Sequence, residues 1–250
     1  MAEWNDLSRE LDAWCAENRR ATFWWRDDDA VCQTAALERL LDTSHETQTP
    51  VAVAVIPGEM DTELVGYLDN REDIEVLQHG FKHINHAPPP SKASEFGPER
   101  DPQTRLNELS KGRKLLSKFR RLLPVLVPPW NRIDESLLRF LPEIGISGIS
   151  TFAPRAADEV PGLTRVNTHV DIVNWRHGRK FLGIADTLEC VVDHLRARRA
   201  GSADPDEATG LLTHHLVHDE QGWAFLVEFL SLTGAHSGAR WVKAEEAFGF

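Results

Sequence analysis

Residues 78–86 place two histidines, His79 and His83, four positions apart. If the backbone turns helical after the apolar run at 74–77, both side chains lie on one face, because helical residues i and i+4 share a face. Imidazole nitrogen is the commonest protein ligand for zinc and similar metals, so the pair is a candidate half-site. Gly80 directly follows His79, which excludes the zincin pattern, because that pattern requires Glu there. The alternative is a helix start that happens to be rich in histidine.

A third, anionic ligand is available at the acidic triplet 27–29, which follows an aromatic-rich segment that we expect to be a strand. Other reactive residues also stand directly after expected strands, at 128–131, 171–175 and 214–215. In parallel α/β folds the functional groups gather at the carboxyl ends of the strands. Together with the histidine pair, these placements predict a metal-dependent site more strongly than the pair alone.

Stretches typical of strands and helices alternate along the whole chain. We expect strands at 21–26, 51–56, 74–77, 125–127, 146–150, 164–167, 169–172 and 210–213. We expect helices at 4–18, 34–41, 62–68, 103–122, 136–141, 187–199 and 222–232. The alternation shows no repeat and no composition break, which predicts a single parallel α/β domain over residues 1–250, with the helix of residues 1–20 packed outside it. The proline-rich segment 87–102 is either a lid or substrate wall, or an inert loop.

The composition narrows the class of protein. The net charge of −11, from 39 acidic and 28 basic residues, argues against a nucleic-acid or anionic-membrane binder. Three scattered cysteines indicate no disulfide framework and fit a reducing compartment. No apolar run is long enough to span a bilayer, and the first residues lack the features of a signal peptide. We therefore expect a cytoplasmic protein without a nucleic-acid or membrane partner; the oligomeric state is left open.

The order and local sequence of these motifs resemble the polysaccharide deacetylase superfamily, carbohydrate esterase family 4, which includes chitooligosaccharide deacetylase-like domains. The first, second and fifth family motifs are Thr-Phe-Asp-Asp-Gly, His-(Ser/Thr)-x-x-His and Leu-x-His, which correspond to 26–30, 79–83 and 212–214. The third and fourth motifs, Arg-x-Pro-Tyr and Asp-x-x-Asp-Trp, are matched less well, by 127–130 and 171–175. The resemblance covers residues 23 to about 241. It implies an α/β fold, a distorted (β/α) barrel of about seven parallel strands.

The resemblance also implies roles for individual residues. The implied ligands of one divalent metal, expected to be Zn²⁺, are Asp29, His79 and His83. The implied catalytic groups are Asp28 as general base, His214 as general acid, Asp171 orienting that acid, and the backbone N–H of Trp130 facing the oxyanion. The residues expected to support the site or contact substrate are Arg26, Asn131 and Trp175. Such a metal polarises an amide carbonyl and activates water.

The sequence departs from the family pattern at several positions. Val127 stands where the family has an arginine that holds the catalytic base. Arg26 lies two residues before Asp28, on the same strand face, and could replace that arginine; Arg132 is the other candidate. Gly80 replaces a hydroxyl residue, which we expect to remove only a local hydrogen bond.

Residues outside the motifs carry weaker expectations. Trp24 and Trp25 are expected to be core residues. His86, His215 and His218 could each support the site or lie on the surface. Of the three, His86 is the one most expected to support the site.

The expected function is that of a metal-dependent hydrolase removing an acyl group, expected to be acetyl, from an N-acylated sugar or related small amide. The substrate would be a small molecule or an oligosaccharide. One alternative is an inactive sugar-binding protein on the same scaffold, which Val127 and Asn174 favour because both depart from the motifs. Another is a non-haem iron oxygenase with a two-histidine, one-carboxylate triad. The helix–strand alternation opposes that reading, since the class usually has an all-β barrel.

Overall fold

Strand β1 (Ala21–Ala30) is the longest strand in the computed structural model, which describes residues 2–155 and 160–250. The other strands are β2 (Val51–Val55), β3 (Ile74–His79), β4 (Leu122–Val127), β5 (Gly148–Ile149), β6 (Thr164–Arg165), β7 (Val170–Asp171), β8 (Val173–Asn174), β9 (Lys180–Phe181), β10 (Thr209–Thr213) and β11 (Ala239–Trp241). The α-helices are α1 (Trp4–Ala16), α2 (Ala35–Glu46), α3 (Glu63–Asp69), α4 (Pro102–Leu116), α5 (Ile184–Ala200), α6 (Glu220–Ala235) and α7 (Ala244–Phe248).

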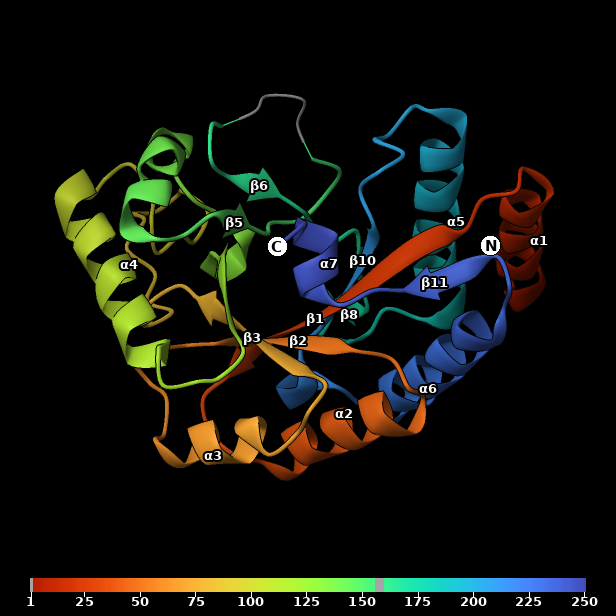
Figure 1. Cartoon of the computed structure of the whole chain (residues 1–250), viewed down its shortest axis with the longest axis horizontal. Coiled ribbons are helices and arrows are strands. Elements are labelled where there is room, and N and C mark those ends of the chain that lie inside the picture. Colours follow the sequence, from red (N-terminus) through yellow and green to blue (C-terminus); the bar gives the residue numbers. More distant parts are fainter. Residues whose placement is uncertain (1, 156–159) are drawn as a thin grey trace.

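The main sheet is parallel and curls into a distorted barrel with helices around it (Figure 1). Its strand order is β6-β5-β4-β3-β2-β1-β10-β7, and β11 pairs with the start of β1. This confirms the expected barrel, with eight strands on the path where about seven were expected. The expected strands at 146–150, 164–167 and 169–172 are shorter, two residues each. The expected helix at 136–141 is a 3₁₀ helix, Glu135–Phe140.

The side chains of β1 point alternately into the barrel and out towards the helices. Trp24 packs in the inner cluster with Ala52, whereas Phe23 and Trp25 pack in the outer cluster between the sheet and the helices. Both tryptophans are fully buried, as expected. Burial of each such side chain is worth roughly 1.5–3 kcal/mol or more, so the register of β1 is strongly fixed. Arg26 shares the inner face with Trp24, two residues nearer to the carboxyl end.

Helix α1 lies outside the sheet and packs against α5 on one side of the barrel (Figure 1). Its Leu7, Leu11 and Trp14 are buried, and Glu10 forms an ion pair of 2.8 Å with Arg199 of α5. The predicted amphipathic helix therefore covers the barrel from outside. Among the described residues, none of the helices combines the length and the apolarity that crossing a membrane requires.

Candidate active site

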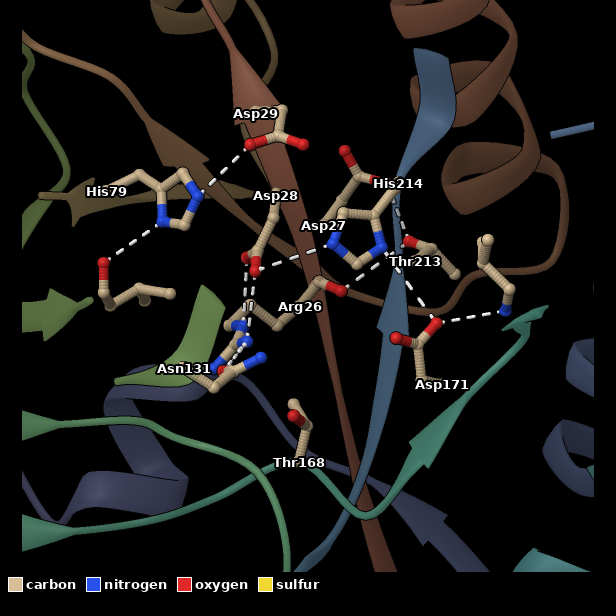
Figure 2. Close-up of polar contacts among 12 residues, drawn as sticks. Arg26, Asp27, Asp28, Asp29, His79, Asn131, Thr168, Asp171, Thr213 and His214 are labelled. Atoms are coloured by element: carbon tan, nitrogen blue, oxygen red, sulfur yellow. Dashed lines mark hydrogen bonds and ion pairs between the residues drawn. The ribbon is translucent and has the colours of Figure 1, made fainter. Parts of the chain in front are cut away.

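A bulge in β1 brings two consecutive aspartates to the same mouth of the barrel. In a regular strand Asp28 and Asp29 would point to opposite faces. The pairing of β1 with β2 shifts register between Asp27 and Ala30, and Asp29 has a φ of +74°. A bulge of this kind redirects a side chain, and a left-handed non-glycine residue costs on the order of 1–3 kcal/mol. Asp29 therefore reaches His79 beside it (Figure 2).

The two histidines meet without a helix, so the expected helical arrangement is wrong. His79 is the last residue of β3, and His83 lies in the loop that follows. Gly80 and His83 both have a φ of +57°, in the left-handed region, which prevents a regular helix. The loop instead folds back on itself, and the two imidazole centroids lie 5.2 Å apart.

Asp29, His79 and His83 fit a divalent metal. Their ligand atoms all lie within 4.8 Å of one another. Asp29 Oδ1 is 3.1 Å from His79 Nε2 and 3.5 Å from His83 Nε2. Neighbouring ligands at about 2.0–2.2 Å from one ion stand roughly 3 Å apart, so little movement is needed. His79 Nδ1 lies 3.0 Å from the Val127 carbonyl, and donation there directs the Nε2 lone pair towards the site.

The electrostatics of the ligand set favour cation binding. Burial alone would raise the pKa of the Asp29 carboxyl, but its hydrogen bond with His79 and the neighbouring histidine charges lower that pKa. Burial lowers the pKa of His83, and His79 lowers it further, which favours the neutral, ligating form. For His79, burial would lower the pKa, but the charges of Asp28 and Asp29 raise it. The same two carboxylates would also attract a divalent cation, which would compete with the proton on His79.

Arg26 supports Asp28 from inside the barrel. Its Nε lies 2.9 Å from Asp28 Oδ1, and its Nη2 donates to Oδ2 at 3.0 Å. The guanidinium is completely buried and also donates to Ser150 Oγ at 2.7 Å and to Asn131 Oδ1 at 2.7 Å. The other candidate, Arg132, is exposed and donates to the Ala93 carbonyl at 3.0 Å. The structure therefore pairs Asp28 with Arg26.

Arg26→Met is expected to move the acidic limb of the pH–rate profile to higher pH. Removing a fixed cation beside a carboxylate favours its protonated form. Metal content should stay near one ion per chain, because Arg26 contacts none of the three proposed ligands. The measurement is kcat/KM against pH with metal analysis.

Arg198→Met is the matched control for loss of a buried arginine. Arg198 is 1% exposed and donates to Thr22 and Thr209, near the start of β1 and β10 and away from the site. This variant should lower the melting temperature without moving the pH–rate profile. An unmoved profile with near-normal turnover in Arg26→Met would make Arg26 purely structural.

His214 lies between two carboxylates just after β10 (Figure 2). Its Nε2 is 3.9 Å from Asp28 Oδ2, and its Nδ1 is 4.0 Å from Asp171 Oδ1. Asp171 is held by hydrogen bonds from the Val173 N–H at 2.9 Å and the Trp175 indole at 2.7 Å. Burial raises the pKa of Asp171, an effect that the charge of His214 opposes. Small closures would give hydrogen bonds at both imidazole nitrogens.

Of the fourth motif, Asp171 and Trp175 lie beside His214, whereas Asn174 bonds within its own loop. Asn174 accepts a hydrogen bond from the His177 N–H at 3.1 Å, on the β8 side of the loop. Asp171 is thus the carboxylate beside His214. Trp175 lies edge-on to the His214 ring at 4.7 Å and is 42% exposed, which leaves its indole accessible from the mouth.

The third motif forms a strained turn beside the metal ligands. Trp130 and Asn131 have φ values of +55° and +56°, within the 3₁₀ turn Pro129–Asn131. The Trp130 ring lies 4.3 Å from that of His83, and Asn131 contacts Arg26. The assignment of the Trp130 N–H to the oxyanion stays a prediction.

Asp27 and His215 form a buried pair that was not expected from the sequence, where His86 was the favoured supporting histidine. His215 Nδ1 lies 2.5 Å from Asp27 Oδ1, and its backbone N–H donates to Oδ2 at 3.1 Å. Burial would lower the pKa of His215, but Asp27 raises it. His86 is exposed. Strand alternation could have indicated the Asp27–His215 pair. Asp27 faces away from Asp28 into a core, where a charge requires a partner.

No family model matches the sequence, and no curated protein sequence matches it. Solved structures do match. A putative polysaccharide deacetylase from Mycobacterium smegmatis superposes with a TM-score of 0.62 at 17% identity, covering 90% of this chain and 87% of that one. A family 4 acetyl xylan esterase from Clostridium thermocellum, solved with a cobalt ion, gives 0.55 at 12%, covering 91% and 90%.

One structural match has a different chemistry. A 4-α-glucanotransferase from Thermococcus litoralis gives a TM-score of 0.55 at 12% identity, covering 92% of this chain and 40% of that one. A fold alone therefore does not decide the reaction, which depends on the residues of the site. From the comparisons and the sheet topology together, the chain shares its fold with a polysaccharide deacetylase and a family 4 acetyl xylan esterase.

Proposed function

We propose that the chain is a metal-dependent hydrolase that removes an acyl group, expected to be acetyl, from an N-acylated sugar or a related small amide. One observation carries the proposal: a three-ligand set, Asp29, His79 and His83, shares a mouth with Asp28 and His214, whose side chains lie 3.9 Å apart. The structural likeness to a deacetylase and to an esterase, the latter holding a cobalt ion, supports this assignment.

The roles of the side chains follow from their positions. An ion held by the three ligands supplies Lewis acidity, which polarises a carbonyl and makes water more acidic. Asp28, held in place by Arg26, accepts the proton of the attacking water. His214, oriented by Asp171, donates a proton to the departing nitrogen. Each such proton transfer typically contributes roughly 10²–10⁴-fold. Trp130 N–H is the proposed donor to the developing oxyanion.

The ligand types, the exposed Trp175 and the cysteines support our proposals for the metal, the substrate and the location of the protein. Two imidazoles and one carboxylate suit Zn²⁺ and leave positions open, as in catalytic zinc sites. The exposed indole of Trp175 offers a stacking surface for a sugar ring, which fits a small or oligomeric carbohydrate substrate. Three free cysteines fit a reducing compartment, and we assign the protein to the cytoplasm on that basis.

A substrate panel with metal analysis tests the proposal. Purified full-length protein is loaded with Zn²⁺, its metal content is measured, and acetate and formate release are assayed over N-acylated monosaccharides, oligosaccharides and small amides. Turnover that a chelator abolishes and added Zn²⁺ restores supports the proposal. A protein that binds metal and sugars yet releases no acid is the inactive sugar-binding protein instead.

His214→Ala is expected to lower kcat by roughly 10²–10⁴ on the best panel substrate, because the departing amine loses its proton donor. Metal content should stay near one ion per chain, because His214 is outside the proposed ligand set. Steady-state kinetics and metal analysis check both expectations.

His215→Ala is the matched comparison, one residue along the chain. It leaves the buried Asp27 carboxylate without its ionic partner, a loss worth roughly 3–5 kcal/mol of stability. The melting temperature should therefore fall further than the rate. If His215→Ala is the change that removes turnover while His214→Ala is active, the acid assignment moves by one residue.

A further inference from the structure

The proline-rich segment after the histidines contains a buried strap, residues 94–97, wedged between two loops of the site. On one side the Ser94 N–H donates to Asn85 Oδ1 at 3.0 Å, and the His86 N–H donates to the Ser94 carbonyl at 3.0 Å. On the other side the Asp134 N–H donates to the Phe96 carbonyl at 2.9 Å, next to the third-motif turn. The strap therefore joins the loop that carries His83 to the loop after Pro129–Asn131.

The carboxylate of Glu95 points from the strap into the histidine loop. Glu95 is 1% exposed. Its Oε2 accepts from the Phe81 N–H at 3.0 Å, and its Oε1 accepts from the Lys82 N–H at 2.7 Å. Among the described residues no cationic side chain forms an ion pair with it. A buried carboxylate is costly without partners, so the two loop amides are what satisfies it.

Gly80 leaves room for this carboxylate. A Cβ on Gly80 would overlap Glu95 Oε2 and lie 2.6 Å from the Pro129 ring, and the φ of +57° also disfavours any other residue. Gly80 therefore provides space for Glu95 in addition to lacking a hydroxyl group. Where the family pattern has a hydroxyl residue, this chain has a glycine and, from a distant segment, a carboxylate that satisfies the loop amides.

We propose that Glu95 is a positioning residue that fixes the loop between His79 and His83 in the shape that presents His83 to the metal. This inference rests on the proposed metal site. His79 is held by β3, whereas His83 stands on irregular backbone with a left-handed φ, so its position depends on what holds the loop. Two amides fixed at consecutive positions, directly before His83, restrict that backbone before any ion binds, which lowers the ordering cost of binding.

The test is the dissociation constant for Zn²⁺, measured by competition with a chromogenic chelator on the full-length, metal-free protein. Glu95→Gln keeps the shape but turns one acceptor oxygen into an NH₂ group facing a loop N–H. We expect the dissociation constant to rise roughly 10–100-fold, the usual effect of removing support behind metal ligands. Glu95→Asp, which retains the carboxylate on a shorter side chain, should recover part of the affinity.

Glu75→Gln is the matched control. Glu75 is 4% exposed and likewise accepts two backbone N–H groups, from Ala244 at 2.7 Å and Glu245 at 3.1 Å, at the start of α7. This variant should lose stability as Glu95→Gln does but keep its dissociation constant within about twofold. If Glu95→Gln also keeps its affinity, Glu95 is only structural. If the wild type binds no divalent ion, the metal site itself fails, and this inference fails with it.

Hydrogen exchange on the metal-free wild type gives a measurement that needs no variant to fold. The amides of Phe81 and Lys82 should be strongly protected, because both donate to a buried carboxylate. Exchange at the rate of an unstructured loop would overturn the inference, since the loop would then be unheld before the metal binds.

Discussion

His79→Ala is expected to abolish tight binding of a divalent ion, and turnover should fall below detection with it. The substitution removes Nε2, which lies 3.1 Å from Asp29 Oδ1 at the centre of the ligand set. Four-ligand zinc sites bind with about 10–16 kcal/mol, so one ligand is worth roughly 3–4 kcal/mol, or about 10²–10³ in affinity. Asp29 and His83 cannot make up that loss. Metal content after dialysis, by plasma mass spectrometry, is the measurement.

His86→Ala is the control for this loss. His86 is three residues beyond His83, exposed, and outside the ligand set, so its removal should leave one ion per chain. Full occupancy in His79→Ala would mean that the proposed ligands are wrong. Activity that survives in a metal-free His79→Ala protein would separate the chemistry from the metal altogether.

The barrel was predictable because the signals that specify it are local. The continuous apolar run at 51–56 and the alternation of strands with helices are visible in the sequence, and the structure has β2 at Val51–Val55 inside a parallel sheet. The rule that reactive residues lie at the carboxyl ends of parallel strands then brings the acidic triplet, the histidines and His214 to one mouth. The structure places Asp28, Asp29, the histidine pair and His214 there, whereas Asp27 lies on the other face of β1 with His215.

The features of the site that could not be predicted depend on backbone geometry or on partners from other segments of the chain. Neither the bulge that redirects Asp29 nor the left-handed φ of His83 has a marker in the sequence, since both are non-glycine residues. Glu95 supports the histidine loop from a segment that sequence reasoning treated only as a wall or a loop. Arg26 could be foreseen because its distance from Asp28 along one strand is fixed at two residues, and the ion pair follows from that spacing.

Asp28→Asn is expected to lower kcat by at least roughly 10²–10⁴ while metal content stays near one ion per chain. The carboxamide occupies the same space and still accepts one hydrogen bond from Arg26, but it cannot take a proton from water. Asp29→Asn, one position along, should lose the metal and the activity together, because it replaces an anionic ligand. Kinetics and metal analysis on both variants separate base from ligand.

Asp27→Asn completes the comparison across the acidic triplet. Asp27 is fully buried on the other face of β1 and bonds His215 and Thr213, so its substitution should lower stability more than turnover. Three consecutive carboxylates would then show three different losses: stability at 27, catalysis at 28, and metal at 29. The alternation of β1 puts Asp27 and Asp28 on opposite faces, and the bulge brings Asp29 to the same mouth as Asp28. Metal loss in Asp28→Asn with retention in Asp29→Asn would shift the assignment by one residue and remove the functional reason for the bulge.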